Sequence, residues 1–301
     1  MPATSRAMFP RRRVLGAALG TVTAAALAPA VATAAPGTPR IRQIPLQGAV
    51  NVRDIGGHRA GHGGRVRHGL VYRADALSKL TAADVTTLSA LRLRQVVDYR
   101  VPLEVQYDGA DRLPAGVPGV ARPVTDNGLY ARILAAIASQ DPVRQEEMLG
   151  GGRAAAFMRS VYPMFVTSAD NRARFAATLH DIAYGRGSLL YHCTSGKDRT
   201  GWTTYVLLRL LGVPERIAVD DYLASNTFRA AHDAKLRESL RQSGAMRDPE
   251  LLIPLQEVRT EYLGAALDQV RADHGSLRRY VTDGLGVDRR TVAMLRARLV
   301  E

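Results

Sequence analysis

Short apolar runs alternate with longer segments of helical periodicity along most of the chain. Four runs have the length and composition of buried strands, and they cover residues 70–72, 95–98, 119–124 and 188–192. Helical patterns lie between or after them. Because strands that alternate with helices build parallel sheets, this order predicts an α/β fold, with one central, mostly parallel sheet flanked by helices.

The last third of the chain has a mainly helical pattern. A helix is expected from Thr200 to the stop signal Gly212-Val213-Pro214, and a weak capping box starts another over residues 81–93. Further helices are predicted over residues 214–226, 227–242, 254–273, 276–283 and 288–300. The polar, Gly-rich stretch 51–58 predicts a loop.

Residues 127–163 form an insertion with two amphipathic stretches, around 129–137 and 154–164, which three glycines separate. Two interpretations stay open for it. It is either a helical lid that moves over a site or an ordinary helical hairpin that packs on the sheet.

The N-terminus has the layout of an export signal. Residues 1–34 carry four arginines and no acidic residue, and an apolar run extends from Val14 to Val31. Arg11-Arg12-Arg13 resembles a twin-arginine signal, and Ala32-Thr33-Ala34 suits a signal peptidase, so we expect one extracytoplasmic domain over residues 35–301. A transmembrane anchor is the alternative. The run is rich in Ala and Gly rather than Leu, Ile and Phe, so no stable membrane insertion is expected after signal removal.

The chain is strongly basic, with 41 Lys and Arg residues against 28 Asp and Glu. Removing the four arginines of the leader leaves 37 basic residues, a formal charge of about +9. Anionic substrates suit this charge, although a genome that favours arginine explains it equally well. The basic residues are dispersed and only 6% of the residues are aromatic, which argues against a nucleic-acid partner.

A single cysteine, Cys193, excludes any intramolecular disulfide. A lone cysteine is often only a buried apolar residue, so its surroundings decide its role. It follows a predicted strand and precedes a predicted helix. The segment reads His192-Cys193-Thr194-Ser195-Gly196-Lys197-Asp198-Arg199-Thr200-Gly201.

This segment offers what phosphoryl transfer by a thiol requires. The reaction needs a thiolate, donors for the phosphoryl oxygens and an acid for the leaving oxygen. Amides that curl at a helix N-terminus make an anion site and favour the thiolate of Cys193. Arg199, six residues later, presents a planar fork to two phosphoryl oxygens.

The other loop residues are expected to bind the phosphate of the substrate. Gly196 permits a tight turn, Lys197 adds positive charge, and Thr200 can hydrogen-bond the thiolate. His192 is expected to organise the loop rather than to act as acid or base. The expected substrate-binding residues of the loop are Thr194, Ser195, Gly196, Lys197 and Thr200.

Two aspartates compete to protonate the leaving group: Asp198 in the loop and Asp98 at the end of a predicted strand. Asp198 is favoured because it neighbours Arg199 and must approach the anion site. The alternative is that Asp198 only balances Lys197 and Arg199, while Asp98 acts or binds a loop arginine. Asp126 is the third candidate.

Arg53 is a further candidate for lining the pocket, although an Arg53–Asp54 ion pair that holds a turn explains it as well. His58, His62 and His68 lie in a Gly- and Arg-rich stretch without the spacing of metal ligands. Neither a metal nor a cofactor is therefore expected.

Over residues 41–300 the sequence resembles the bacterial secreted tyrosine-phosphatase family typified by mycobacterial protein tyrosine phosphatase B. The loop pattern HCxxGKDRTG carries most of the resemblance. Weaker patches follow in the family's order: Asn51-Val52-Arg53-Asp54-Ile55-Gly56-Gly57, Tyr72-Arg73, Ala76-Leu77-Ser78, Val97-Asp98-Tyr99-Arg100, Asp220-Asp221-Tyr222-Leu223-Ala224-Ser225-Asn226, Glu261-Tyr262-Leu263 and Gly275-Ser276.

The resemblance implies a phosphatase fold, a cysteinyl-phosphate intermediate, no metal, and activity on phosphotyrosine, with phosphoserine, phosphothreonine or phosphoinositides as substrates of relatives. It also supports a lid over residues 127–163. We therefore predict an exported cysteine-dependent phosphatase that acts on a phosphorylated protein or phospholipid. Two other functions stay open: an inactive phosphatase fold that binds phosphorylated ligands, and a rhodanese-like sulfurtransferase, which the KDRTG sequence disfavours. The sequence does not indicate an oligomeric state.

Overall fold

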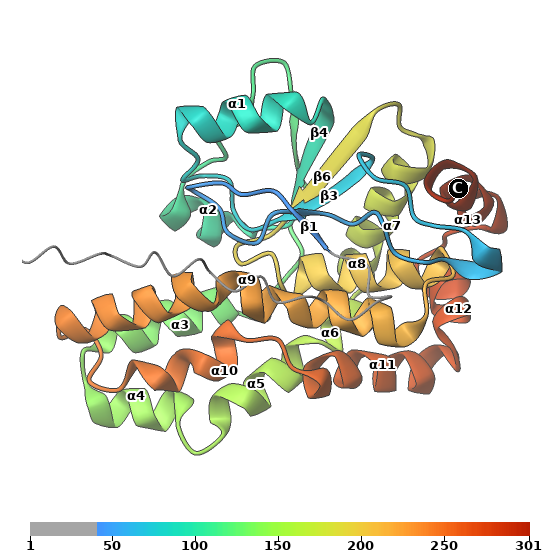
Figure 1. The fold of residues 1–301 in the computed structure, drawn as a ribbon. Coiled ribbons are helices and arrows are strands. Elements are labelled where there is room, and N and C mark those ends of the chain that lie inside the picture. Colours follow the sequence, from blue (N-terminus) through green and yellow to red (C-terminus); the bar gives the residue numbers. More distant parts are fainter. Residues whose placement is uncertain (1–40) are drawn as a thin grey trace, which may run out of the picture. The chain divides into compact units, whose positions relative to one another are not determined.

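The computed structural model describes residues 41–301. Six strands form one sheet in the order β1-β2-β3-β6-β4-β5 (Figure 1). The predicted export signal, residues 1–34, lies outside the described residues. Within residues 41–301, no helix combines the length and the apolar character needed to cross a membrane.

The sheet is mostly parallel, as predicted. The strands are β1 (Arg42–Gln43), β2 (Arg53–Asp54), β3 (Val71–Ala74), β4 (Leu93–Asp98), β5 (Gly119–Ala121) and β6 (Ser188–His192). β3, β6, β4 and β5 pair in parallel, while β1 and β2 add an antiparallel edge. The predicted loop 51–58 thus contains β2, and two residues are too few to show a strand's alternation.

Helices cover both faces of the sheet (Figure 1). They are α1 (Ala82–Ala90), α2 (Pro102–Asp108), α3 (Leu129–Ser139), α4 (Pro142–Leu149), α5 (Arg153–Val161), α6 (Met164–Thr167), α7 (Ala169–Tyr184), α8 (Arg199–Leu210), α9 (Glu215–Gln242), α10 (Ile253–Gln256), α11 (Thr260–His274), α12 (Leu277–Arg279) and α13 (Arg289–Leu299). Two 3-10 turns, Gly61–Gly63 and Pro249–Leu252, and a π turn, Tyr280–Gly284, complete the chain.

Alternation along β6 shows why its sequence is a continuous apolar run. Successive side chains point to opposite faces of a sheet. Leu189 and Tyr191 join the larger core cluster, which includes residues of α7 and α8, while Leu190 joins a smaller cluster with Leu88 of α1. Since both faces are buried, the middle of the strand, Leu189 to Tyr191, has no charged residue on either face.

The helices after α8 differ from the predicted boundaries. Residues 214–242 were expected to form two helices but form one, α9, because no Gly or Pro interrupts them. Asn226, at the expected break, instead exchanges two hydrogen bonds of 2.8 Å with the backbone of Val258. The predicted helix 254–273 is divided into α10 and α11 by extended backbone at Glu257.

The insertion is helical, as predicted, and contains α3, α4 and α5. α3 packs on α4, α4 on α5, and α5 on α10 and α11. Gly151 and Gly152 join α4 to α5 with positive φ angles of 56° and 80°, which glycine adopts without strain. Movement of this layer as a lid stays a prediction.

A cluster of buried charges lies between the edge of the sheet and α9. Arg53 of β2, Arg73 of β3 and Asp221 of α9 have no exposed surface. Asp221 Oδ1 accepts from Arg73 Nη1 at 2.9 Å and from Arg53 Nη2 at 3.3 Å. Burial acts to raise the pKa of Asp221, but the charges of both arginines and a contact with His58 hold it far below its usual value.

Replacing this carboxylate tests how strongly the cluster stabilises the fold. Asp221→Asn leaves two buried guanidinium groups without a counter-charge, so we expect the free energy of unfolding to fall by about 3–5 kcal/mol. Since the folded pKa of Asp221 is depressed, its stabilisation is present above about pH 4 and is lost progressively below it. Urea unfolding at pH 7 and pH 3.5 measures both effects.

Asp220→Asn is the matched control, because Asp220 is exposed and lies 3.5 Å from Arg216 in a surface pair. Its loss should cost at most about 1 kcal/mol. Equal destabilisation by both substitutions would contradict the role given to the buried cluster.

Candidate active site

The loop of residues 193–198 joins β6 to α8 at the C-terminal edge of the parallel strands. Ligands of open α/β sheets bind at this edge. The predicted order of strand, loop and helix is confirmed. Gly196 has φ +64°, and a Cβ atom on it would lie 2.3 Å from the carbonyl oxygen of Ala74. Only glycine therefore fits this turn.

Buried side chains hold two carbonyl groups of the loop. Asn51 Nδ2 donates to the carbonyl oxygens of Ser195 and Gly196 at 3.0 Å each. Arg73 Nη2 donates to Gly196 O at 2.7 Å. Asn51 and Arg73 are fully buried and do not line the cavity, so they hold these carbonyl groups from beneath the loop.

The same contacts orient the amides that follow. In a planar trans peptide the N–H points opposite to the C=O, so the N–H groups of Gly196 and Lys197 turn away from Asn51 and Arg73. Within residues 41–301, neither N–H donates a hydrogen bond. Together with the N-terminus of α8, they form a site for an anion.

Arg199 is fixed beside this site by Glu104. Glu104 Oε2 accepts from Arg199 Nη1 at 2.7 Å, and Oε1 accepts from Nη2 at 2.5 Å. Glu104 also accepts from the Thr194 hydroxyl. Burial acts to raise the pKa of Glu104, but the charge of Arg199 outweighs it, so the pKa lies below its usual value. A carboxylate thus positions the arginine.

Sequence reasoning missed Glu104 and considered Asp98 as the partner of a loop arginine. The sequence does contain the pattern of a helix start here, with Pro102 at the first position of α2 and Glu104 two residues later. In the structure Glu104 accepts from the amide of Val101 at 2.7 Å, as acidic residues at helix starts do. α2 has only seven residues, which is too short for a clear helical periodicity.

Glu104→Gln tests whether this pair organises the anion site. A neutral amide offers one acceptor oxygen instead of two, so the Arg199 fork loses its fixed orientation. We expect the affinity for inorganic phosphate to fall about 10- to 100-fold, the effect of losing a hydrogen bond between charged groups. Isothermal titration calorimetry measures this affinity.

Glu147→Gln serves as the control, because Glu147 is exposed on α4. It should leave phosphate binding unchanged. Unchanged binding in Glu104→Gln as well would show that Glu104 has no positioning role.

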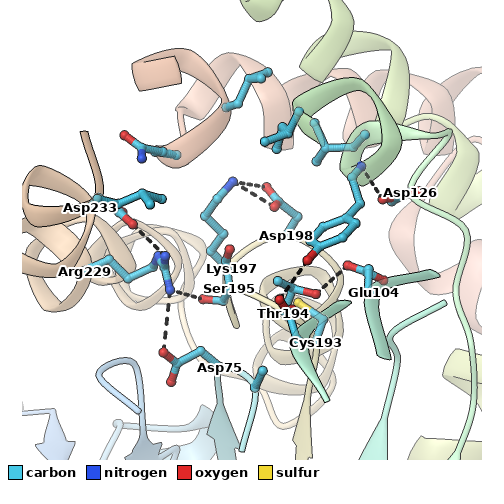
Figure 2. A pocket seen from close by; sticks show the side chains of 18 of the residues that line it. Asp75, Glu104, Asp126, Cys193, Thr194, Ser195, Lys197, Asp198, Arg229 and Asp233 are labelled. Atoms are coloured by element: carbon cyan, nitrogen blue, oxygen red, sulfur yellow. Dashed lines mark hydrogen bonds and ion pairs between the residues drawn. The ribbon is translucent and has the colours of Figure 1, made fainter. Parts of the chain in front are cut away.

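Asp198 lies in the cavity that Cys193 lines (Figure 2). Its Oδ1 accepts from the Tyr162 hydroxyl at 2.8 Å, and its Oδ2 accepts from Lys197 Nζ at 2.8 Å. Tyr162 in turn lies 2.6 Å from the hydroxyl of Tyr222. Because Tyr162 directly follows α5, the insertion reaches the loop of residues 193–198 and helps to position Asp198.

The two other candidate acids lie in different places. Asp98 does not line the cavity, and its carboxylate accepts from Arg100 Nη2 at 2.9 Å. Asp126 does line the cavity, where it accepts from the backbone N–H groups of Gly128 and Tyr130 at 3.0 and 2.8 Å. Two of the three predicted candidates therefore reach the same space as Cys193.

His192 is held behind the loop by acidic residues. Its Nε2 lies 2.8 Å from Asp111, and Asp98 and Asp111 share the guanidinium of Arg100. Asp98, Asp111 and His192 converge as metal ligands would, yet Arg100 supplies the positive charge between the carboxylates. Burial acts to lower the pKa of His192, but the hydrogen bond and charge of Asp111 outweigh it and raise the pKa.

Three predicted substrate-binding residues, Arg53, Gly196 and Thr200, have no side chain or backbone that lines the cavity. Gly196 belongs to the turn of the loop itself. Arg53 is fully buried and contacts Asn51 and Asp221, so it supports the loop from beneath. Thr200 is also fully buried, and its hydroxyl has no hydrogen-bond partner within residues 41–301. The expected bond from Thr200 to the sulfur of Cys193 is not formed. Neither side chain reaches the cavity.

The cavity above Cys193 has a volume of about 390 Å³, within the range of small-molecule sites. Cys193 itself is only 1% exposed. Figure 2 shows Lys197 and Asp198 in the middle of the view, Glu104 to their right, and Arg229 to their left between Asp75 and Asp233. The loop residues that line the cavity are Cys193, Thr194, Ser195, Lys197, Asp198 and Arg199.

The chain is similar in sequence to known phosphatases. A model of the tyrosine phosphatase family matches residues 44–301. A Cupriavidus necator protein whose name places it among tyrosine-protein phosphatases is 35% identical over 247 residues, covering 82% of this chain and 84% of that protein. The triple specificity protein phosphatase PtpB of Mycobacterium tuberculosis is 28% identical over 281 residues, which cover 86% of this chain and 99% of that protein. The crystal structure of P. aeruginosa TpbA has a TM-score of 0.30 and 14% identity, covering 78% of this chain and 98% of that one.

Proposed function

Because the chain belongs to the tyrosine phosphatase family, we propose that it hydrolyses phosphotyrosine in proteins, with Cys193 as the nucleophile. One observation carries the proposal: Cys193 lines one cavity with Lys197 and with Arg199, whose guanidinium Glu104 orients, at the N-terminus of α8. Within residues 41–301, the N–H groups of Gly196 and Lys197 in the same loop donate no hydrogen bond. All of these stabilise the negative charge of a phosphoryl group in the transition state.

The geometry suggests a reaction in two steps. The thiolate of Cys193 attacks phosphorus, the P–O bond to tyrosine breaks, and the leaving oxygen keeps the electron pair and takes a proton from Asp198. Water then attacks the cysteinyl phosphate, gives its proton to Asp198, and releases phosphate and the thiolate. Arg199 and the amides of Gly196 and Lys197 bind the phosphoryl oxygens throughout.

The depth of the site supports phosphotyrosine as the main substrate. Cys193 is 1% exposed, so the ester must reach in from the surface. A phenolic side chain is longer than that of phosphoserine or phosphothreonine, the further candidates together with phosphoinositides. Rates on matched phosphotyrosine and phosphoserine peptides compare these classes.

We also propose that residues 1–34 direct the enzyme out of the cytoplasm by the twin-arginine route. The arginines, the apolar run and the small residues of this segment support export. Cell fractionation of the native chain and of a variant with Arg11, Arg12 and Arg13 replaced by lysine tests the route.

Cys193→Ser tests the nucleophile. A hydroxyl is a far weaker nucleophile than a thiolate at neutral pH, so we expect aryl phosphate hydrolysis to fall at least about 10³-fold. Phosphate binding should persist. Hydrolysis at the parent rate would exclude the covalent mechanism.

The same experiment separates the alternative functions. Phosphate binding by a parent protein that hydrolyses nothing would indicate a binding module. Persulfide formation on Cys193 from thiosulfate, without hydrolysis, would indicate a sulfurtransferase.

The leaving group identifies the acid. Asp198→Asn should lower the turnover of phenyl phosphate about 10²- to 10⁴-fold, and much less that of dinitrophenyl phosphate, whose leaving group needs no proton. Asp98→Asn and Asp126→Asn are the matched comparisons, and a leaving-group-dependent loss in either one instead would move the role from Asp198.

A further inference from the structure

The cavity has an aliphatic wall that the chemistry at Cys193 does not require. α3 presents Leu129, Ile133 and Ile137 to it at a spacing of four residues, one stripe of the helix, together with Leu134. Leu236 of α9 and Leu252 and Leu255 lie across the cavity. Leu236 is 42% exposed, and the four aliphatic residues of α3 are half-buried. Covering this wall would remove apolar surface from water.

The charges that line the cavity oppose a second anionic group. Six carboxyl groups face it, those of Asp75, Glu104, Asp108, Asp126, Asp198 and Asp233, against the four cations Lys79, Lys197, Arg199 and Arg229. Five of the six remain anionic when Asp198 holds the proton that it donates. Although the chain as a whole is basic, the lining of its cavity is not.

Three of the four cations already have carboxylate partners. Arg199 binds Glu104, and Lys197 binds Asp198. The third, Arg229, lies 2.6 Å from Asp233 and 3.6 Å from Asp75. The loop therefore supplies one site for a dianion, and the rest of the cavity offers little compensation for another.

We propose that the site also takes a phosphate monoester of an aliphatic chain: an amphiphile with a single phosphate, whose chain lies along the α3 stripe while the phosphate binds the loop. The phosphate site and the aliphatic wall are parts of the same cavity, so one molecule can fill both. This activity rests on the proposed function, since it uses the same nucleophile.

An alkyl phosphate fits this wall better than a peptide segment does. A peptide brings N–H and C=O groups that need partners when they are buried, and most polar side chains of the cavity are engaged in pairs. An alkyl chain needs none. The volume of about 390 Å³ suits a small ligand rather than a folded segment.

The alkyl ester reacts by the same two steps as the aryl ester. The Cys193 thiolate forms the S–P bond, the P–O bond to the alkyl group breaks, and the alkoxide oxygen takes the proton of Asp198. Water then cleaves the S–P bond and returns a proton to Asp198. The products are a fatty alcohol and inorganic phosphate.

The test measures kcat/KM for ethyl, butyl, hexyl and octyl phosphate as monomers in solution. The leaving alcohols have nearly the same acidity, so differences report contact of the chain with the wall. We expect kcat/KM to rise up to about fourfold per methylene until the chain fills the cavity. A soluble inositol bisphosphate should react more slowly than octyl phosphate.

Ile137→Ser should flatten the dependence on chain length, while Ala138→Ser, on the exposed side of α3, should leave the dependence unchanged. Phenyl phosphate is assayed in parallel. Its hydrolysis together with a flat alkyl series would overturn this inference and leave the proposed function intact. If aliphatic residues beside phosphotyrosine raise the rate on peptides while longer alkyl chains do not raise the rate on alkyl phosphates, the inference is likewise overturned and the proposed function stands. No hydrolysis of either ester would overturn both proposals.

Discussion

The site depends on one constraint: two guanidinium groups, of Arg53 and Arg73, are buried beneath the loop of residues 193–198 and must be neutralised there. Asp221 supplies the charge, and Arg73 then has a further donor for the carbonyl of Gly196. With that carbonyl held from beneath, the next amide turns toward the cavity. An isolated loop would not keep its amides on one side, because its polar groups would be solvated in any orientation.

A second ion pair, between Glu104 and Arg199, also holds the loop in place. Glu104 comes from α2, far from the loop in sequence, and it fixes both Arg199 and Thr194. Tyr162, which follows the inserted helices, fixes Asp198. Arg199 and Asp198 are therefore oriented by different elements, which is consistent with a site preorganised by packing rather than by the loop sequence alone.

The sequence predicted the parts of this site that local chemistry determines. The parallel sheet, the strand and helix that enclose the loop, and the residues of the loop itself followed from apolar runs, a stop signal and one motif. What could not be predicted depends on distant contacts. Arg53 and Thr200 have side chains suited to phosphate, yet the fold buries both away from the cavity. Glu104 carried no sign in the sequence of which arginine it would meet.

The central claim is that this scaffold presents Cys193 to a phosphoryl group as a covalent nucleophile. Rapid quenching of the reaction with an aryl phosphate, followed by mass spectrometry of the peptide that contains Cys193, tests it most directly. We predict a phosphoryl group on the sulfur of Cys193 that forms and decays at rates compatible with turnover. Steady hydrolysis with phosphate on no residue, or on a residue other than Cys193, would contradict it.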